Sequence, residues 1–115
     1  MGKIRVLVVD DSFFVRKAVT RMLSKEPRIE VIETAADGKE AIEKIIRYKP
    51  DVVTMDIVMS GMDGITALGY IMNNMPLPVI MFSSHTQEGA DLTLKALDMG
   101  ALDFVDKSST DASLL

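Results

Sequence analysis

The chain has 115 residues, a length that suits one domain with a single core. Hydrophobic residues make up 48% and charged residues 26%, which is typical of a soluble globular protein and excludes a disordered one. The net charge of −4 disfavours nucleic-acid binding, and the lack of cysteine excludes disulfides and thiolate metal sites. Because no apolar run approaches the roughly 20 residues that span a bilayer, we expect a cytoplasmic protein without a membrane partner.

The first half of the chain alternates short β-branched runs with amphipathic stretches. Residues 4–9 predict a buried strand, and residues 12–25 carry apolar side chains at helical spacing. Residues 31–35 predict a second strand. A second helix follows Asp37, the predicted N-cap, with Glu40 placed to complete a capping box. Its predicted buried face comprises Ala41, Ile42, Ile45 and Ile46.

The second half of the chain continues this alternation. Its predicted elements are a strand over 51–55, a helix over 65–74, a strand over 79–82, a helix over 87–99 and a short strand over 103–105. Strands that alternate with helices predict an α/β fold, in which a parallel sheet is covered by helices on both faces. Ligands of such sheets bind outside the carboxyl ends of the strands.

Polar residues follow four of the predicted strands. Asp10 and Asp11 follow the first strand, Asp56 the third and Ser83 the fourth, and Lys107 comes shortly after the fifth. Each residue alone is ordinary, because an aspartate after a strand is usually a turn or cap residue and a lysine usually lies in solvent. Their shared position at the carboxyl ends of strands in a parallel sheet predicts a common site.

These residue types point to phosphoryl transfer. Carboxylates that are brought together repel one another, and a hard cation relieves the repulsion. Oxygen ligands without histidine or cysteine favour Mg²⁺ over Zn²⁺. A carboxylate beside Mg²⁺ can attack a phosphoryl group, as Asp56 could here. The ammonium of Lys107 and the hydroxyl of Ser83 would then stabilise the transferred oxygens.

The motifs at these strand ends resemble the response-regulator receiver domain. The matching segments are Val-Val-Asp-Asp-Ser at 8–12, Met-Asp-Ile-Val-Met-Ser-Gly-Met-Asp-Gly at 55–64, Phe-Ser-Ser at 82–84, and Lys107. The resemblance covers nearly the whole chain. It implies a doubly wound, flavodoxin-like five-stranded parallel sheet in the order 2-1-3-4-5, and a phosphorylation-dependent signalling switch whose phosphodonor is a sensor histidine kinase.

The resemblance also implies a role for each site residue. Asp56 would be the phosphoacceptor, and Lys107 would bind the phosphoryl group. The implied Mg²⁺ ligands are Asp10, Asp11, Asp56 and the carbonyl of Val58. Ser83 and Phe104 would form the switch, although Phe104 taken alone would predict a core residue. Val58 and His85 would flank the path of the water that hydrolyses the phosphoryl group.

A finer resemblance concerns residues 82–105, which resemble the receiver of the chemotaxis protein-glutamate methylesterase family. We expect a receiver domain over 1–107, with 108–115 as a polar tail or the start of a truncated fifth helix. A catalytic output domain, if the parent protein has one, is absent from this chain. The chain alone would then only phosphorylate and dephosphorylate itself at Asp56.

Two positions depart from the receiver pattern, because Ser60 and Ser108 stand where the family usually has proline. A cis peptide before a residue other than proline costs about 2.5–4 kcal/mol. This cost leaves open whether the Lys107–Ser108 bond is cis or trans, and with it whether Lys107 reaches the site.

Other functions remain as alternatives. The chain could be a stand-alone receiver or one with a different output. A haloacid-dehalogenase-like phosphatase would need two aspartates separated by one residue after the first strand, whereas Asp10 and Asp11 are adjacent. A flavin-binding flavodoxin would need a hydroxyl-rich phosphate loop at the same place, where this chain carries two acids.

Overall fold

The structure, a computed structural model, describes residues 2–83 and 87–107, so His85 lies outside the described residues. The elements in chain order are β1 (Ile4–Val9), α1 (Phe13–Ser24), β2 (Ile29–Ala35), α2 (Gly38–Tyr48), β3 (Val52–Asp56), α3 (Gly64–Asn74), β4 (Val79–Ser83), α4 (Gln87–Asp98) and β5 (Asp103–Asp106). Every predicted strand and helix is present, with bounds that differ from the prediction by at most two residues.

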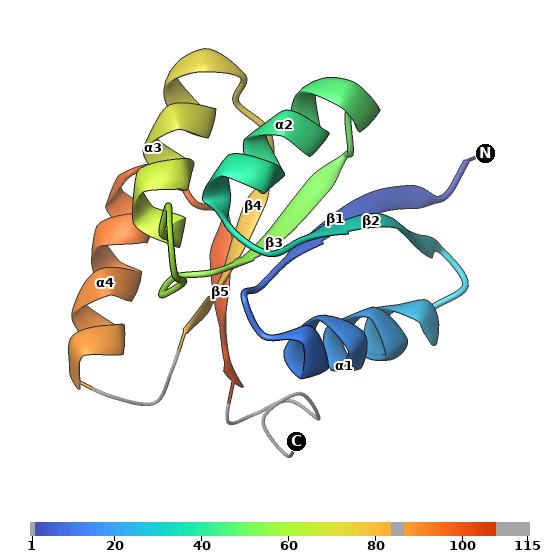
Figure 1. The fold of residues 1–115 in the computed structure, drawn as a ribbon, viewed down its shortest axis with the longest axis horizontal. Coiled ribbons are helices and arrows are strands. Elements are labelled where there is room, and N and C mark those ends of the chain that lie inside the picture. The colour runs from blue at the N-terminus through green and yellow to red at the C-terminus, as the bar shows by residue number, and fades with distance from the viewer. Residues whose placement is uncertain (1, 84–86, 108–115) are drawn as a thin grey trace.

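The strands form one parallel sheet in the order β2-β1-β3-β4-β5, which confirms the doubly wound, flavodoxin-like topology (Figure 1). The chain winds outward in opposite directions from β1 and β3, so the topological switch point lies between these two strands. Register places Val9 opposite Met55, and Asp56 opposite Phe82. The carboxyl ends of β1, β3, β4 and β5 therefore lie at one edge of the sheet.

The sheet has a different core on each face. Helices α2, α3 and α4 cover one face, and α1 covers the other (Figure 1). Side chains alternate between these faces, because successive residues of a strand point to opposite sides. The larger core contains Leu7, Val9, Val53, Met55, Val79 and Met81 from the strands. The core beneath α1 contains Val6, Val8 and Phe82, with Ile80 and Val105 packed against it.

Two details of α2 differ from the sequence prediction. The side chain of Ile46 is 58% exposed, so the buried face consists of Ala41, Ile42 and Ile45. The predicted capping box is only half formed. The Glu40 backbone N–H donates to the Asp37 carboxylate at 2.9 Å, but the carboxylate of Glu40 pairs with Lys44 at 3.1 Å. An ion pair one turn along the helix has taken the place of the reciprocal capping bond.

The loop after β3, residues 57–63, is held from both sides. The Gly38 backbone N–H, in the first turn of α2, donates to the Met62 carbonyl at 2.9 Å. The Gly64 backbone N–H donates back to the Ile57 carbonyl at 2.9 Å, and a Cβ at Gly64 would lie 2.2 Å from the Asp56 carbonyl oxygen. Gly61 has φ +72°, a conformation that glycine adopts without strain. The loop therefore has one well-braced path beside Asp56.

None of the helices in the described part of the chain is long and apolar enough to cross a bilayer.

Candidate functional site

Strand alternation explains why three of the predicted site residues meet. In β1, Val8 faces the core beneath α1, so Asp10, two residues later, continues on that side. Lys107 follows Val105 of the same core by the same spacing. Asp56 directly follows Met55, which packs in the core on the other face, so the Asp56 side chain points to the α1 side. All three side chains thus lie on the α1 side of the sheet, at the carboxyl ends of β1, β3 and β5.

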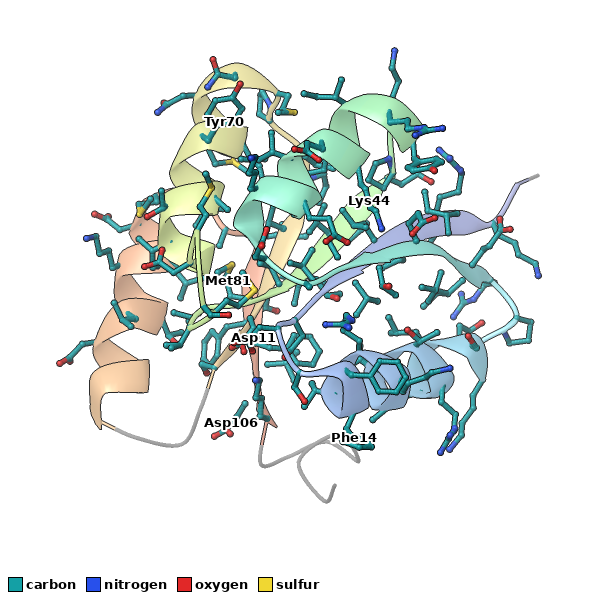
Figure 2. All side chains as sticks on the ribbon, viewed as in Figure 1. Asp11, Phe14, Lys44, Tyr70, Met81 and Asp106 are labelled. Atoms are coloured by element: carbon teal, nitrogen blue, oxygen red, sulfur yellow. The ribbon has the colours of Figure 1, made fainter. Side chains whose placement is uncertain are left out.

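The resulting cluster is compact. One carboxylate oxygen from each of Asp10, Asp11 and Asp56 lies within 4.8 Å of the others. The Lys107 ammonium lies 2.8 Å from Asp56 Oδ2 and 3.2 Å from Asp10 Oδ2. Lys107 therefore reaches the site, which settles the question its sequence context left open; the Lys107–Ser108 bond lies outside the described residues. Figure 2 shows Asp11 near the end of β1 and Asp106 near the end of β5, at the same edge of the sheet.

Burial shapes the charge of this cluster. Asp10 and Asp56 are 3% and 6% exposed, whereas Asp11 faces solvent. Burial raises the pKa of the Asp56 carboxyl to about 6; the Lys107 ammonium opposes this rise, and the Asp10 charge adds to it. Burial lowers the pKa of Lys107, but its hydrogen bond and ion pairs with Asp56 and Asp10 outweigh burial and leave that pKa raised. At neutral pH the site therefore holds an ionised Asp56 beside a charged lysine.

Asp10 is held in place by α1, through contacts that the sequence did not reveal. Its Oδ1 accepts a hydrogen bond from the Ser12 backbone N–H at 2.9 Å, and its backbone carbonyl accepts one from Arg16 Nη1 at 2.7 Å. Ser12 is also the N-cap of α1, since its hydroxyl accepts from the Val15 backbone N–H. Arg16 lies on the first turns of the helix that starts beside Asp10, and this nearness was the only sequence signal for its role.

The loop after β3 contacts the other two carboxylates. The Val58 backbone N–H approaches Asp56 Oδ1 at 3.4 Å. The Ser60 backbone N–H donates to Asp11 Oδ2 at 3.1 Å and joins residues 49 positions apart. The Val58 side chain is 56% exposed. The sequence could not reveal the contact of Ser60 with Asp11, because a backbone donor leaves no signature in residue type.

Ser83 and Phe104 lie on the neighbouring strands. Ser83 is 6% exposed and follows Phe82, the register partner of Asp56, so it lies one residue further toward the strand ends. Phe104 is in register with Met81, which places it on the face of the sheet that Ser83 shares. The Phe104 side chain is 44% exposed, so it is not the core residue that its type alone would predict. His85 lies outside the described residues.

Comparisons with known proteins agree on one family. The family model for the response regulator receiver domain matches residues 6–115. Protein-glutamate methylesterase/protein-glutamine glutaminase 3 of Pseudomonas syringae pv. syringae is 57% identical over 110 residues, which are 96% of this chain and 28% of that protein. The corresponding protein 1 of Vibrio cholerae serotype O1 is 57% identical over 108 residues, 94% of this chain and 29% of that protein. The chain thus spans less than a third of these curated relatives.

Solved structures show the same relationship. The response regulator domain of Thermotoga maritima CheB has a TM-score of 0.85 and 51% identity, with 91% of this chain and 78% of that chain covered. The structure of a CheX–CheY complex with BeF3 and Mg from Borrelia burgdorferi contains a chain with a TM-score of 0.84 and 37% identity. That match covers 98% of this chain and 84% of the other.

Proposed function

This chain belongs to the response regulator receiver domain family, and we propose that Asp56 is the residue through which it is switched, by accepting a phosphoryl group from a histidine kinase. The observation that carries the proposal is the position of the Asp56 carboxylate. It is buried at the end of β3, lies 2.8 Å from the Lys107 ammonium and shares a cluster with the carboxylates of Asp10 and Asp11. A nucleophile, a cation and metal-binding acids thus occupy one site.

The donor set of the cluster fits Mg²⁺. It offers carboxylate oxygens from Asp10, Asp11 and Asp56 without any histidine or cysteine, and oxygen donors are the ligands that Mg²⁺ prefers. The Val58 carbonyl would be a further ligand. Bound Mg²⁺ would neutralise charge on the oxygens of the transferred phosphoryl group. Lys107 alone carries one positive charge against three carboxylates, so a divalent cation complements the site.

The side chains divide the work of phosphoryl transfer. An Asp56 oxygen forms the new O–P bond while the bond between phosphorus and the donor breaks, and its electron pair leaves with the donor group. The nucleophile is ready above its pKa of about 6 without a separate base. Lys107 offsets charge on the phosphoryl oxygens, and the Ser83 hydroxyl donates a hydrogen bond to one of them.

Labelling with acetyl phosphate tests this function. The wild-type chain, incubated with acetyl phosphate and Mg²⁺, is expected to gain the mass of one phosphoryl group, in a linkage that hydroxylamine cleaves. A chelator should prevent the gain, because a phosphoryl donor that approaches three carboxylates offset by one ammonium alone meets strong repulsion. A chain that gains no mass under these conditions would contradict the proposal.

Ser83 and Phe104 are proposed as the switch that reports the phosphoryl group. Phosphorylation adds charge and strong acceptor oxygens, which can attract the buried Ser83 hydroxyl. We expect Ser83 to move toward the phosphoryl group and the exposed Phe104 ring to turn into the space that it leaves, which changes the surface of α4 and β5. A crystal structure with beryllofluoride and Mg²⁺ tests this. If Ser83 and Phe104 keep their free positions there, the switch lies elsewhere.

Val58 is expected to prolong the phosphorylated state. Hydrolysis of an acyl phosphate requires a water held in line, and the exposed Val58 side chain has no polar atom to hold one. Val58→Asn is expected to lose its phosphoryl group several-fold faster, which corresponds to a barrier lower by about 1 kcal/mol. The decay rate of purified phosphoprotein measures this, with Val58→Leu as an apolar control that should decay slowly. Unchanged or slower decay in Val58→Asn would show that Val58 does not limit the access of water, and His85 would be the next residue to test.

The parent protein is proposed to be a cytoplasmic chemotaxis methylesterase-type response regulator. The curated relatives are named protein-glutamate methylesterase/protein-glutamine glutaminase, and this chain matches less than a third of each. Methylesterase activity would reside in a catalytic domain outside this chain, after a receiver domain that we place at 1–107 with a tail at 108–115. The gene sequence downstream of residue 115 tests the proposal. A stop codon there, or a different output domain, would leave the receiver function standing without the methylesterase.

A further inference from the structure

Asp11 differs from the other two carboxylates of the cluster in how it is held. Asp10 and Asp56 are buried and share the Lys107 ammonium. Asp11 is exposed, and its Oδ2 accepts a hydrogen bond from the Ser60 backbone N–H at 3.1 Å. This bond ties the end of β1 to the loop after β3. An exposed carboxylate would otherwise sample several rotamers, and a cation would have to order it on binding.

The Ser60 amide is a well-ordered donor because its loop is braced. The Gly38 backbone N–H holds the Met62 carbonyl at 2.9 Å, and the Gly64 backbone N–H holds the Ile57 carbonyl at 2.9 Å. A Cβ at Gly38 would meet the Met62 carbonyl oxygen at 2.8 Å, which shows how closely α2 packs against the loop. The position of the amide of residue 60 is therefore set by backbone bonds on both sides of it.

We propose that the Ser60 backbone N–H is a positioning group that orients Asp11 for Mg²⁺, an inference that rests on the metal site of the proposed function. The N–H occupies one lone pair of Oδ2 and leaves the carboxylate able to ligate. It also offsets part of the repulsion among the three acids before a metal ion binds. Outer-shell hydrogen bonds to ligating carboxylates raise metal affinity by this kind of ordering.

The decisive variants differ in whether residue 60 keeps its N–H. Ser60→Pro removes the donor, whereas Ser60→Ala removes the hydroxyl and keeps the donor. Calorimetric titration with Mg²⁺ alone, without a phosphodonor, is expected to show about fivefold weaker binding in Ser60→Pro, a smaller loss than for buried outer-shell bonds because this bond is exposed. Ser60→Ala should bind within about twofold of the wild type, since its donor is intact.

The outcomes separate this proposal from the one it rests on. A wild-type chain that binds no Mg²⁺ would overturn the metal site and the role of Ser60 together. A wild type and a Ser60→Pro variant with equal Mg²⁺ affinity would overturn the role of Ser60 alone. An equal loss of affinity in Ser60→Pro and Ser60→Ala would also overturn it, because it would assign the effect to the hydroxyl.

A second measurement tests the same hydrogen bond without introducing proline into the loop. In the wild type without metal, the amide proton of residue 60 is expected to exchange slowly with solvent, and Asp11→Ala should accelerate that exchange several-fold by removing the acceptor. The amide of Gly64, which donates to Ile57, serves as the internal reference and should not change. Exchange at residue 60 that is indifferent to Asp11→Ala would show that the hydrogen bond does not order this pair.

Discussion

Asp56→Asn is expected to abolish labelling by acetyl phosphate and Mg²⁺. An amide in place of the carboxylate is a poor nucleophile, while the shape of the side chain and its place at the end of β3 are retained. The variant keeps Asp10 and Asp11, so it also tests whether either of these could accept the phosphoryl group instead. Intact-mass measurement after incubation decides the matter. Labelling equal to that of the wild type would show that Asp56 is not the acceptor.

The stability of the Asp56→Asn variant distinguishes loss of the nucleophile from loss of the fold as the cause of the lost labelling. Burial raises the pKa of Asp56 from 3.8 to about 6, so the folded state binds its proton more tightly than the unfolded state does. Ionised Asp56 therefore costs stability above pH 6, by at most about 3 kcal/mol, and the cost disappears as the pH falls toward 4. Asparagine carries no such cost, and Lys107 still has Asp10 as a partner.

Asp56→Asn should accordingly be at least as stable as the wild type at pH 8, with an advantage that shrinks at pH 5. Urea unfolding at the two pH values measures this. Asp98→Asn, at the exposed end of α4, removes the same formal charge far from the cluster and should show no such dependence. An Asp56→Asn variant that is clearly less stable than the wild type at pH 8 would show that the carboxylate supports the fold.

The strand-end residues could be predicted from the sequence because each lies directly or shortly after a predicted strand. Alternation within the strands then decides which of them meet. The face of the sheet that α1 covers carries the side chains of Asp10, Asp56 and Lys107, whereas the other face carries those of Ser83 and Phe104. The topology of the sheet followed from the same alternation of strands and helices, together with the receiver motifs.

Whether the Lys107 side chain reaches Asp56 could not be predicted, because this depends on where β5 ends. The apolar pattern predicted a strand that ends at residue 105, but strand pairing continues to Asp106, opposite Ser83. One further residue of extended backbone carries Lys107 to Asp56. The contacts of Ser60 and Arg16 were also hidden, since both involve backbone atoms whose position is set by folding rather than by residue type.

Lys107→Met is expected to lower the free energy of unfolding by about 2–3 kcal/mol at pH 8. The ammonium contacts Asp56 at 2.8 Å and Asp10 at 3.2 Å, and its removal leaves two buried carboxylates without a cation. Methionine keeps most of the apolar stem, so the loss measures charge rather than packing. The lysine side chain is 23% exposed, which places the effect below that of a fully buried pair. Lys95→Met, on an exposed part of α4, is the matched control.

The loss in Lys107→Met should depend on pH and on Mg²⁺. Without the ammonium, only the long hydrogen bond from the Val58 backbone N–H opposes the effect of burial on Asp56, so the pKa of Asp56 rises further above 6. Protonation then relieves the repulsion with Asp10, and the difference from the wild type should be smaller at pH 5 than at pH 8. Added Mg²⁺ should raise the midpoint of thermal unfolding more in Lys107→Met than in the wild type, because the cation no longer meets a neighbouring ammonium. An equal loss at both pH values, with no extra gain from Mg²⁺, would mean that Lys107 stabilises the fold by packing and leaves the charge of the cluster to other groups.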